Sequence, residues 1–306
     1  ANTTTCRIKV EAIGNIFFDM SDVNFTITGA LLAKIADFDG DGKTDLSVYR
    51  SGSWLVNQSN GGSSTSFPFG LASDRIVPND YDGDAKTDYA VFRNGSWYMQ
   101  RSTAGFAGVA FGTTGDIPVA GDYDGDAKAD VAVYRPSTGT WYVLRSTNNV
   151  VTAQNWGTTG DVPVVGDYDG DGKADYAVFR ASTATWYLLR STAGATATAF
   201  GISTDAPVPS DYDGDGKTDI ATARNTGGFL SWYLLRSTAG YTAVGNWGLA
   251  SDKPSPGDYD GDGKADIAVF RDSDGSWTIR KSSTSSLDLR YFGGSGDISV
   301  PAAYIP

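Results

Sequence analysis

The sequence predicts an all-β fold: a seven-bladed β-propeller of four-stranded blades that forms a single domain over residues 1–306. Three observations support this prediction. An aspartate-rich segment of nine residues occurs six times at intervals of 42 to 47 residues, each copy is followed by the same strand-like pattern, and no stretch has a helical period. Four short strands in every repeat of this length are typical of a propeller blade.

The strand pattern starts from each aspartate-rich segment. An arginine follows the first aspartate by 13 residues, and a tryptophan follows that arginine by 4, 6 or 8 residues. The spacing changes only in steps of two, as expected for a hairpin whose lengthening leaves the same side chains on the buried face. The arginines are Arg50, Arg93, Arg135, Arg180, Arg224 and Arg271, and the tryptophans are Trp54, Trp97, Trp141, Trp186, Trp232 and Trp277.

A pair formed by an aromatic residue and glycine follows each tryptophan by 14 or 15 residues and precedes the next aspartate-rich segment by 11. These landmarks divide each unit into four strands. In the third unit we expect strands near 117–121, 130–135, 140–145 and 151–156.

The chain ends decide the predicted number of blades. Residues 292–304 match residues 111–123, which open an internal unit, and strand-like stretches lie at 6–11 and 16–19. We therefore predict a seventh blade shared by about 1–35 and 290–306, which would close the ring and cover its edge strands. The alternative is an open array of six blades.

Composition excludes several functions. The chain carries 36 acidic and 24 basic residues, a formal net charge of −12. This charge argues against nucleic-acid partners and against docking on anionic membranes, and no apolar stretch is long enough for membrane insertion. Histidine is absent, which removes imidazole as a catalytic base or zinc ligand.

The six aspartate-rich segments fit the pattern D-x-D-G-D-[G/A]-K-x-D. Aspartates at positions 1, 3, 5 and 9 and the carbonyl at position 7 can converge on one hard cation, as in calcium loops. We therefore predict about six Ca²⁺ ions per chain. The predicted ligands are Asp37, Asp39, Asp41, Lys43 and Asp45; Asp80, Asp82, Asp84, Lys86 and Asp88; Asp122, Asp124, Asp126, Lys128 and Asp130; Asp167, Asp169, Asp171, Lys173 and Asp175; Asp211, Asp213, Asp215, Lys217 and Asp219; and Asp258, Asp260, Asp262, Lys264 and Asp266, with each lysine binding through its backbone carbonyl.

Charge balance supports a metal-loaded form. The six segments, 37–45, 80–88, 122–130, 167–175, 211–219 and 258–266, hold 24 of the 36 acidic residues, and six divalent cations would cancel the formal charge. Ala85 and Ala127 replace glycine at position 6. If that position requires a positive φ, alanine costs about 1 kcal/mol and these two sites bind calcium more weakly.

The loop, its spacing and the aromatic–glycine pair resemble FG-GAP/VCBS repeats of the bacterial type, which are related to the integrin α-subunit propeller. The resemblance covers about residues 25–306 and implies a propeller, calcium bound between two strands of a blade, and an extracellular location. This sequence departs from the family's Gly-Ala-Pro element, whose place is taken by Ile117-Pro118-Val119 and its counterparts. The resemblance implies no single function, because a fold alone never does.

We expect a secreted monomer that acts as a non-catalytic binding or adhesion module for glycans or an extracellular protein. Repetition would offer several equivalent sites. The repeated tryptophan–tyrosine pairs are more consistent with core than with a ligand site. Metal loops together with a single cysteine favour secretion, and Cys6 is expected to be a small hydrophobic residue near the terminus rather than a reactive thiol.

Two alternatives stay open. One is a polysaccharide lyase or hydrolase, whose catalytic groups would lie outside the repeat pattern. Asp272, Asp274, Asp288, Tyr241 and Lys253 are the candidates, but none forms a recognisable catalytic pair, so we predict no catalytic residue. The other alternative is an adhesive module of a longer secreted chain that binds no small ligand.

Overall fold

The computed structural model describes residues 9–11, 18–20 and 36–304. The chain divides into two compact units, residues 1–32 and 33–306. In the first unit, β1 (Lys9–Glu11) pairs antiparallel with β2 (Phe18–Met20). These two strands overlap the predicted stretches at 6–11 and 16–19, whose other residues lie outside the described ones, as does Cys6.

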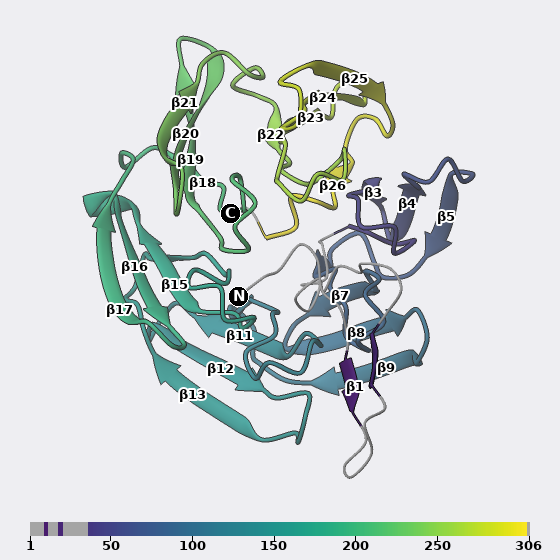
Figure 1. Cartoon of the computed structure of the whole chain (residues 1–306), viewed down its shortest axis with the longest axis vertical. Coiled ribbons are helices and arrows are strands. Elements are labelled where there is room, and N and C mark those ends of the chain that lie inside the picture. Colours follow the sequence, from purple (N-terminus) through teal and green to yellow (C-terminus); the bar gives the residue numbers. More distant parts are fainter. Residues whose placement is uncertain (1–8, 12–17, 21–35, 305–306) are drawn as a thin grey trace. The chain divides into compact units, whose positions relative to one another are not determined.

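The second unit consists of six four-stranded antiparallel sheets, here called blades 1 to 6 (Figure 1). From the innermost strand outward, blade 1 is β26 (Ile298–Ser299), β3 (Leu46–Arg50), β4 (Ser53–Asn57) and β5 (Thr65–Pro68), and blade 2 is β6 (Arg75–Ile76), β7 (Tyr89–Arg93), β8 (Ser96–Arg101) and β9 (Gly105–Ala110). Blade 3 is β10 (Ile117–Pro118), β11 (Val131–Arg135), β12 (Thr140–Leu144) and β13 (Val151–Asn155), and blade 4 is β14 (Val162–Pro163), β15 (Tyr176–Arg180), β16 (Thr185–Arg190) and β17 (Gly194–Ala199). Blade 5 is β18 (Ala206–Pro207), β19 (Ile220–Thr226), β20 (Phe229–Arg236) and β21 (Gly240–Val244), and blade 6 is β22 (Lys253–Pro254), β23 (Ile267–Arg271), β24 (Ser276–Arg280) and β25 (Leu287–Tyr291).

The repeated tryptophan is the centre of each blade. All six are fully buried on the third strand, and each donates its indole N–H to the carbonyl of the aromatic residue that precedes the positive-φ glycine, as Trp54 does to Phe69 at 2.9 Å. Burial with a satisfied N–H is the favourable state for this side chain. Replacing one such tryptophan by alanine would cost about 3–5 kcal/mol. The expectation that the tryptophan–tyrosine pairs form core is confirmed for the tryptophans, whereas the tyrosines are half-buried, each with an arginine over its ring: Tyr98, Tyr142, Tyr187 and Tyr233.

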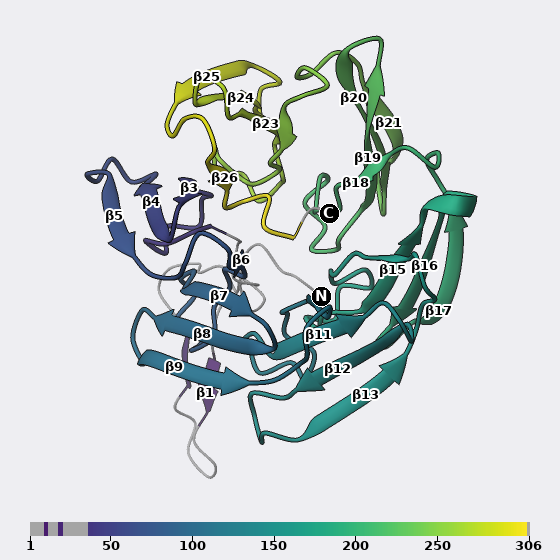
Figure 2. The ribbon, with the colours of Figure 1, turned by 180° about the vertical axis from the view of Figure 1, so that it is seen from behind.

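Neighbouring blades share their cores. Trp97 and Met99 of blade 2 pack with Val131 and Val133 of blade 3, and Tyr142 contacts the same cluster. Both faces of the inner strands are therefore covered, whereas the outermost strands are partly exposed, and β9, β13 and β21 expose alternate side chains. The blades follow one another around a ring, which Figure 2 shows from behind.

A buried aspartate ties the innermost strand of each blade to the second strand. Arg135 at the end of β11 binds both oxygens of Asp116, the residue before β10, at 2.9 Å. This charge-assisted, bidentate geometry is the strong form of such a pair. The equivalent pairs are Arg50–Asp297, Arg93–Asp74, Arg180–Asp161, Arg224–Asp205 and Arg271–Asp252.

The predicted seventh blade is wrong: the described residues form six blades. The segment expected to open a new unit instead supplies β26, the innermost strand of blade 1, where Ile298 pairs with Tyr49 and Ser299 with Val48. The physical reason is that the innermost strand of a blade precedes its aspartate-rich loop, so the strand left over at the C-terminus fits the first blade. Asp297 then pairs with Arg50 as its equivalents do in the other blades.

Among the described residues, no helix is long and apolar enough to cross a membrane. The one helix there is the 3-10 turn η1 (Ala181–Thr183).

Candidate metal loops

The six aspartate-rich segments, here called loops 1 to 6, each lead into the second strand of the blade with the same number. Loop 3 (122–130), for example, runs from the end of β10 to the start of β11. In loop 1, Gly40 and Gly42 at positions 4 and 6 have φ values of +79° and +83°, which glycine adopts without the steric cost that other residues meet. These turns bring the carboxylates of one loop together.

The aspartate at position 1 holds the loop in shape. In loop 1, Asp37 Oδ1 accepts the N–H of Gly40 at 2.7 Å, and its Oδ2 accepts the N–H of Gly42 at 2.9 Å. The equivalent aspartates of loops 2 to 6 accept the same two amides. Such side chain–backbone bonds satisfy amides that a tight turn cannot pair otherwise.

The aspartate at position 9 is buried and joins the loop to a distant turn. Asp45 Oδ2 accepts the N–H of Phe38 at position 2, and its Oδ1 accepts the N–H of Ser59, in the turn between β4 and β5. The same serine donates its hydroxyl to Asp41 at position 5. Both serine contacts recur in all six blades, through Ser102, Ser146, Ser191, Ser237 and Ser282.

In five of the loops, one carboxylate oxygen of the aspartate at position 3 accepts no hydrogen bond. Asp82 Oδ2 accepts the N–H groups of Thr103 and Ala104, but its Oδ1 is buried without a hydrogen-bond donor. The same holds for one oxygen of Asp39, Asp124, Asp169 and Asp213. A buried oxygen without a partner costs about 1–3 kcal/mol, and more if charged, so each of these atoms is suited to a cation.

The structure brings most of the predicted ligands together. In loops 2 to 5, oxygens of positions 1, 3 and 9 lie within 4.8 Å of one another, and in loop 1 those of positions 1, 3 and 5 do. In all six loops the position-5 aspartate also accepts the hydroxyl of the serine in the distant turn. The donor set consists only of hard oxygens, which fits Ca²⁺.

The lysine at position 7 extends toward the preceding loop. Carbons of Lys86 lie 3.1 Å from where a Cβ on Gly40 would stand. The same contact joins Lys128 to Gly83, Lys173 to Gly125, Lys217 to Gly170, Lys264 to Gly214 and Lys43 to Gly261. Glycine at position 4 is therefore favoured by its positive φ, and a larger residue there would also have to displace the neighbouring lysine side chain.

Sequence reasoning missed the turn that follows the third strand. Its serine and threonine supply donors to positions 3, 5 and 9, as Ser191 and Thr192 do in blade 4. A signal was available, because Arg-Ser-Thr occurs at 101–103, 145–147, 190–192 and 236–238.

Burial raises the pKa of the position-9 aspartates in the metal-free loops. It raises the pKa of Asp45, Asp88 and Asp175 to about 7, and that of Asp130, Asp219 and Asp266 to about 6, with neighbouring carboxylates adding to the effect. Backbone N–H groups oppose this shift only in part. These carboxyls therefore favour a proton wherever no cation is bound.

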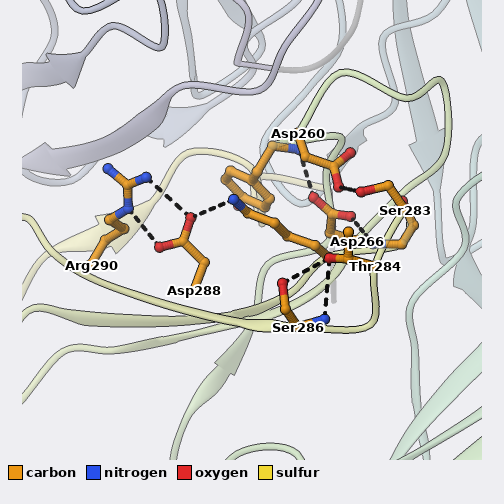
Figure 3. Close-up of polar contacts among 10 residues, drawn as sticks. Asp260, Asp266, Ser283, Thr284, Ser286, Asp288 and Arg290 are labelled. Atoms are coloured by element: carbon orange, nitrogen blue, oxygen red, sulfur yellow. Dashed lines mark hydrogen bonds and ion pairs between the residues drawn. The ribbon is translucent and has the colours of Figure 1, made fainter.

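Of the residues proposed for the enzyme alternative, Asp288 and Asp274 accept hydrogen bonds from neighbouring residues, and Figure 3 shows Asp288 beside Arg290. Asp288 on β25 binds Arg290 at 2.7 Å and Lys281 at 3.1 Å, and hydrogen bonds from Arg290 hold its pKa below the ordinary value. Asp274 accepts the N–H of Ser276 in the hairpin turn before β24. Tyr241 is exposed on β21, and Lys253 is exposed on β22.

Comparison with known proteins supports the repeat. The FG-GAP-like repeat family matches residues 122–178 and 211–269, each of which contains two loops. The structure is similar to a streptogramin B lyase, with a TM-score of 0.53 and 9% identity over 87% of this chain and 86% of that one. It is also similar to TolB from Acinetobacter baumannii, with a TM-score of 0.58 and 18% identity over 85% of this chain and 65% of that one. At these identities the similarity shows the fold alone, and no curated protein matches the sequence.

The raised pKa values predict an unusual pH dependence for the metal-free protein. Between about pH 4 and pH 7 the folded loops bind more protons than the unfolded chain, so the free energy of unfolding falls as pH rises through this window. Urea denaturation in EDTA should give a higher midpoint at pH 5 than at pH 7.5. Asp175→Asn removes one of the six raised carboxyls and should make this fall less steep, and a midpoint that rises with pH in EDTA would contradict the assignment.

The alanines at position 6 give a second prediction. Ala85 and Ala127 have φ values of +64° and +66°, so the condition for weaker calcium sites is met. Ala85→Gly should relieve about 1 kcal/mol of strain and tighten calcium binding at loop 2 by roughly fivefold. Gly42→Ala in loop 1 is the matched reverse change, because nothing lies within 4 Å of the added Cβ. Calorimetric titration of both variants would show opposite shifts, and unchanged curves would argue against the strain.

Proposed function

Because the chain is a β-propeller built from FG-GAP-like repeats, we propose that it is a secreted calcium-binding module that recognises glycans or an extracellular protein without catalysing a reaction. The observation that carries the calcium assignment is the buried, unpaired oxygen of the position-3 aspartate in five of the loops. Positions 1, 3, 5 and 9 and the position-7 carbonyl would hold the ion, and bound calcium would neutralise the clustered carboxylates.

An extracellular location would supply the calcium concentration that these loops need. Calcium loops of extracellular modules have dissociation constants of about 10⁻⁴–10⁻³ M. Such sites would be filled outside the cell and empty in a cytosol. Empty loops would keep four aspartates within nine residues, so the metal-free form is the less favourable one.

The chemistry of the remaining carboxylates supports a non-catalytic role. A glycosidase needs a carboxylic acid whose pKa is raised, next to a second carboxylate. Asp288 instead has its pKa lowered by Arg290, and hydrogen bonds to Ser276 lower that of Asp274. The aspartates whose pKa is raised to about 6 or 7 are already engaged inside the loops.

The outermost strands offer the surface for a ligand. Each repeated tryptophan is buried, but Phe106, Tyr241 and Tyr291 on β9, β21 and β25 are 62%, 61% and 69% exposed. Strand β25 also exposes Leu287 and Leu289. Aromatic side chains are favoured at recognition surfaces because they offer a large, rigid contact area, and their rings can stack on sugars.

The calcium assignment predicts both stoichiometry and stability. Calorimetric titration should give about six ions per chain. At tenfold excess over the dissociation constant each site contributes about 1.4 kcal/mol, so saturating calcium should raise the melting temperature by on the order of 10 °C above that in EDTA. Magnesium at the same concentration is the control, since its octahedral preference suits these loops poorly. A melting temperature that EDTA leaves unchanged would refute the calcium assignment.

The binding role predicts calcium-dependent recognition of a ligand by the outermost strands. A glycan array with the calcium-loaded protein should give binding to one sugar family that is lost in EDTA. Tyr241→Ala or Tyr291→Ala should reduce this binding at least tenfold, whereas the matched phenylalanine variants keep the ring and most of the affinity. A blank array would exclude the glycan ligands tested and favour a protein partner, to be sought by pull-down in calcium.

A further inference from the structure

The six loops are hydrogen bonded to one another in a closed ring. In every blade the N–H at position 8 donates to the main-chain carbonyl at position 1 of the preceding loop. The bonds are Thr87 to Asp37, Ala129 to Asp80, Ala174 to Asp122, Thr218 to Asp167, Ala265 to Asp211 and Thr44 to Asp258, at 2.6–2.7 Å. The last of them joins blade 1 to blade 6 and completes the ring.

These bonds connect the residues that would hold the metal. The acceptor belongs to position 1, whose carboxylate lies in the acidic cluster of its own loop. The donor stands between the position-7 carbonyl and the position-9 carboxylate of the next loop. At the junction of loops 1 and 2 the contact is double, because Asp37 also donates its N–H to Thr87 Oγ1 at 3.0 Å.

We propose that the six calcium loops are coupled through these bonds, so that a cation held in one loop raises the affinity of both neighbouring loops. The inference rests on the proposed calcium sites but goes further, because independent sites would serve a scaffold equally well. In this proposal the loop backbone transmits the effect of a bound cation to the neighbouring loops, in addition to supplying a ligand.

The physical basis is shared ordering. A cation that fixes the position-1 aspartate of loop 1 also fixes the acceptor on which residues 86–88 of loop 2 are docked. Loop 2 then has less conformational entropy to lose when it binds its own cation, which is positive coupling. Thermodynamic linkage requires the same factor in the opposite direction.

Electrostatics acts in the opposite sense, because a cation in one loop weakens the negative potential that attracts a cation to the next. This effect is screened by salt over about 8 Å at physiological ionic strength. The main-chain bonds are short-ranged and salt has little effect on them. The positive coupling should therefore increase between 0.05 and 0.5 M KCl.

The test compares two double variants that each lose two calcium sites. Asp169→Asn with Asp213→Asn removes the neighbouring sites of loops 4 and 5, whereas Asp39→Asn with Asp169→Asn removes the opposite sites of loops 1 and 4. Asparagine keeps an oxygen to accept the turn amides that Asp169 and Asp213 accept. The three single variants complete the double-mutant cycles.

If only neighbouring loops are coupled, the losses of calcium-binding free energy caused by the two single variants should add for the opposite pair but not for the neighbouring pair. In calorimetric titrations, the neighbouring pair should lose less overall calcium affinity than the sum of its single variants, by a factor of about five or more. The wild-type chain should titrate with a Hill coefficient above 1, a measurement that does not depend on any variant folding. Non-cooperative binding of six ions, with both pairs additive, would overturn the coupling and leave the calcium assignment standing. Absence of calcium binding by the wild-type chain would overturn both.

Discussion

The main-chain bond between position 8 of one loop and position 1 of the preceding loop is the contact on which the six-bladed unit depends. It occurs at all six junctions, including the one where Thr44 of blade 1 meets Asp258 of blade 6. The innermost strand β26 secures the same junction from the C-terminal side. Because a closed ring leaves no blade face uncovered, each junction protects the apolar faces of two blades.

Local patterns predicted the blade but not the number of blades. The strands expected at 130–135, 140–145 and 151–156 differ from β11, β12 and β13 by at most one residue at either end, because strand alternation and hairpin spacing act within one unit. The number of blades depends on the angle between neighbouring sheets, which side chains such as Tyr142 and Met99 set by packing across the interface. Residues 292–304 could either open a seventh unit or complete the first, and their sequence fits both.

The sequence likewise predicted one part of the candidate site and missed another. The spacing of aspartates within nine residues predicted the cluster, because a loop that short leaves few arrangements for four carboxylates. The partners of the position-5 aspartate lie 18 to 22 residues downstream, so the interval within one loop says nothing about them. Partial burial acts to raise the pKa of Asp84, but hydrogen bonds from the hydroxyls of Ser102 and Thr103 outweigh it and lower the pKa. Burial raises the pKa of Asp88 at position 9 of the same loop.

Protons and calcium compete for the same oxygens, and this competition links the loops to the stability of the ring. The position-9 aspartate anchors its loop through the N–H at position 2 and lies next to the amide that crosses to the preceding loop. In a metal-free loop no cation balances the charge of this carboxylate. Binding a proton then costs less free energy than keeping the buried charge. At neutral pH the carboxyls whose pKa is about 6 have largely lost that proton and those whose pKa is about 7 hold it only in part. Calcium is then the ion that can neutralise each loop fully.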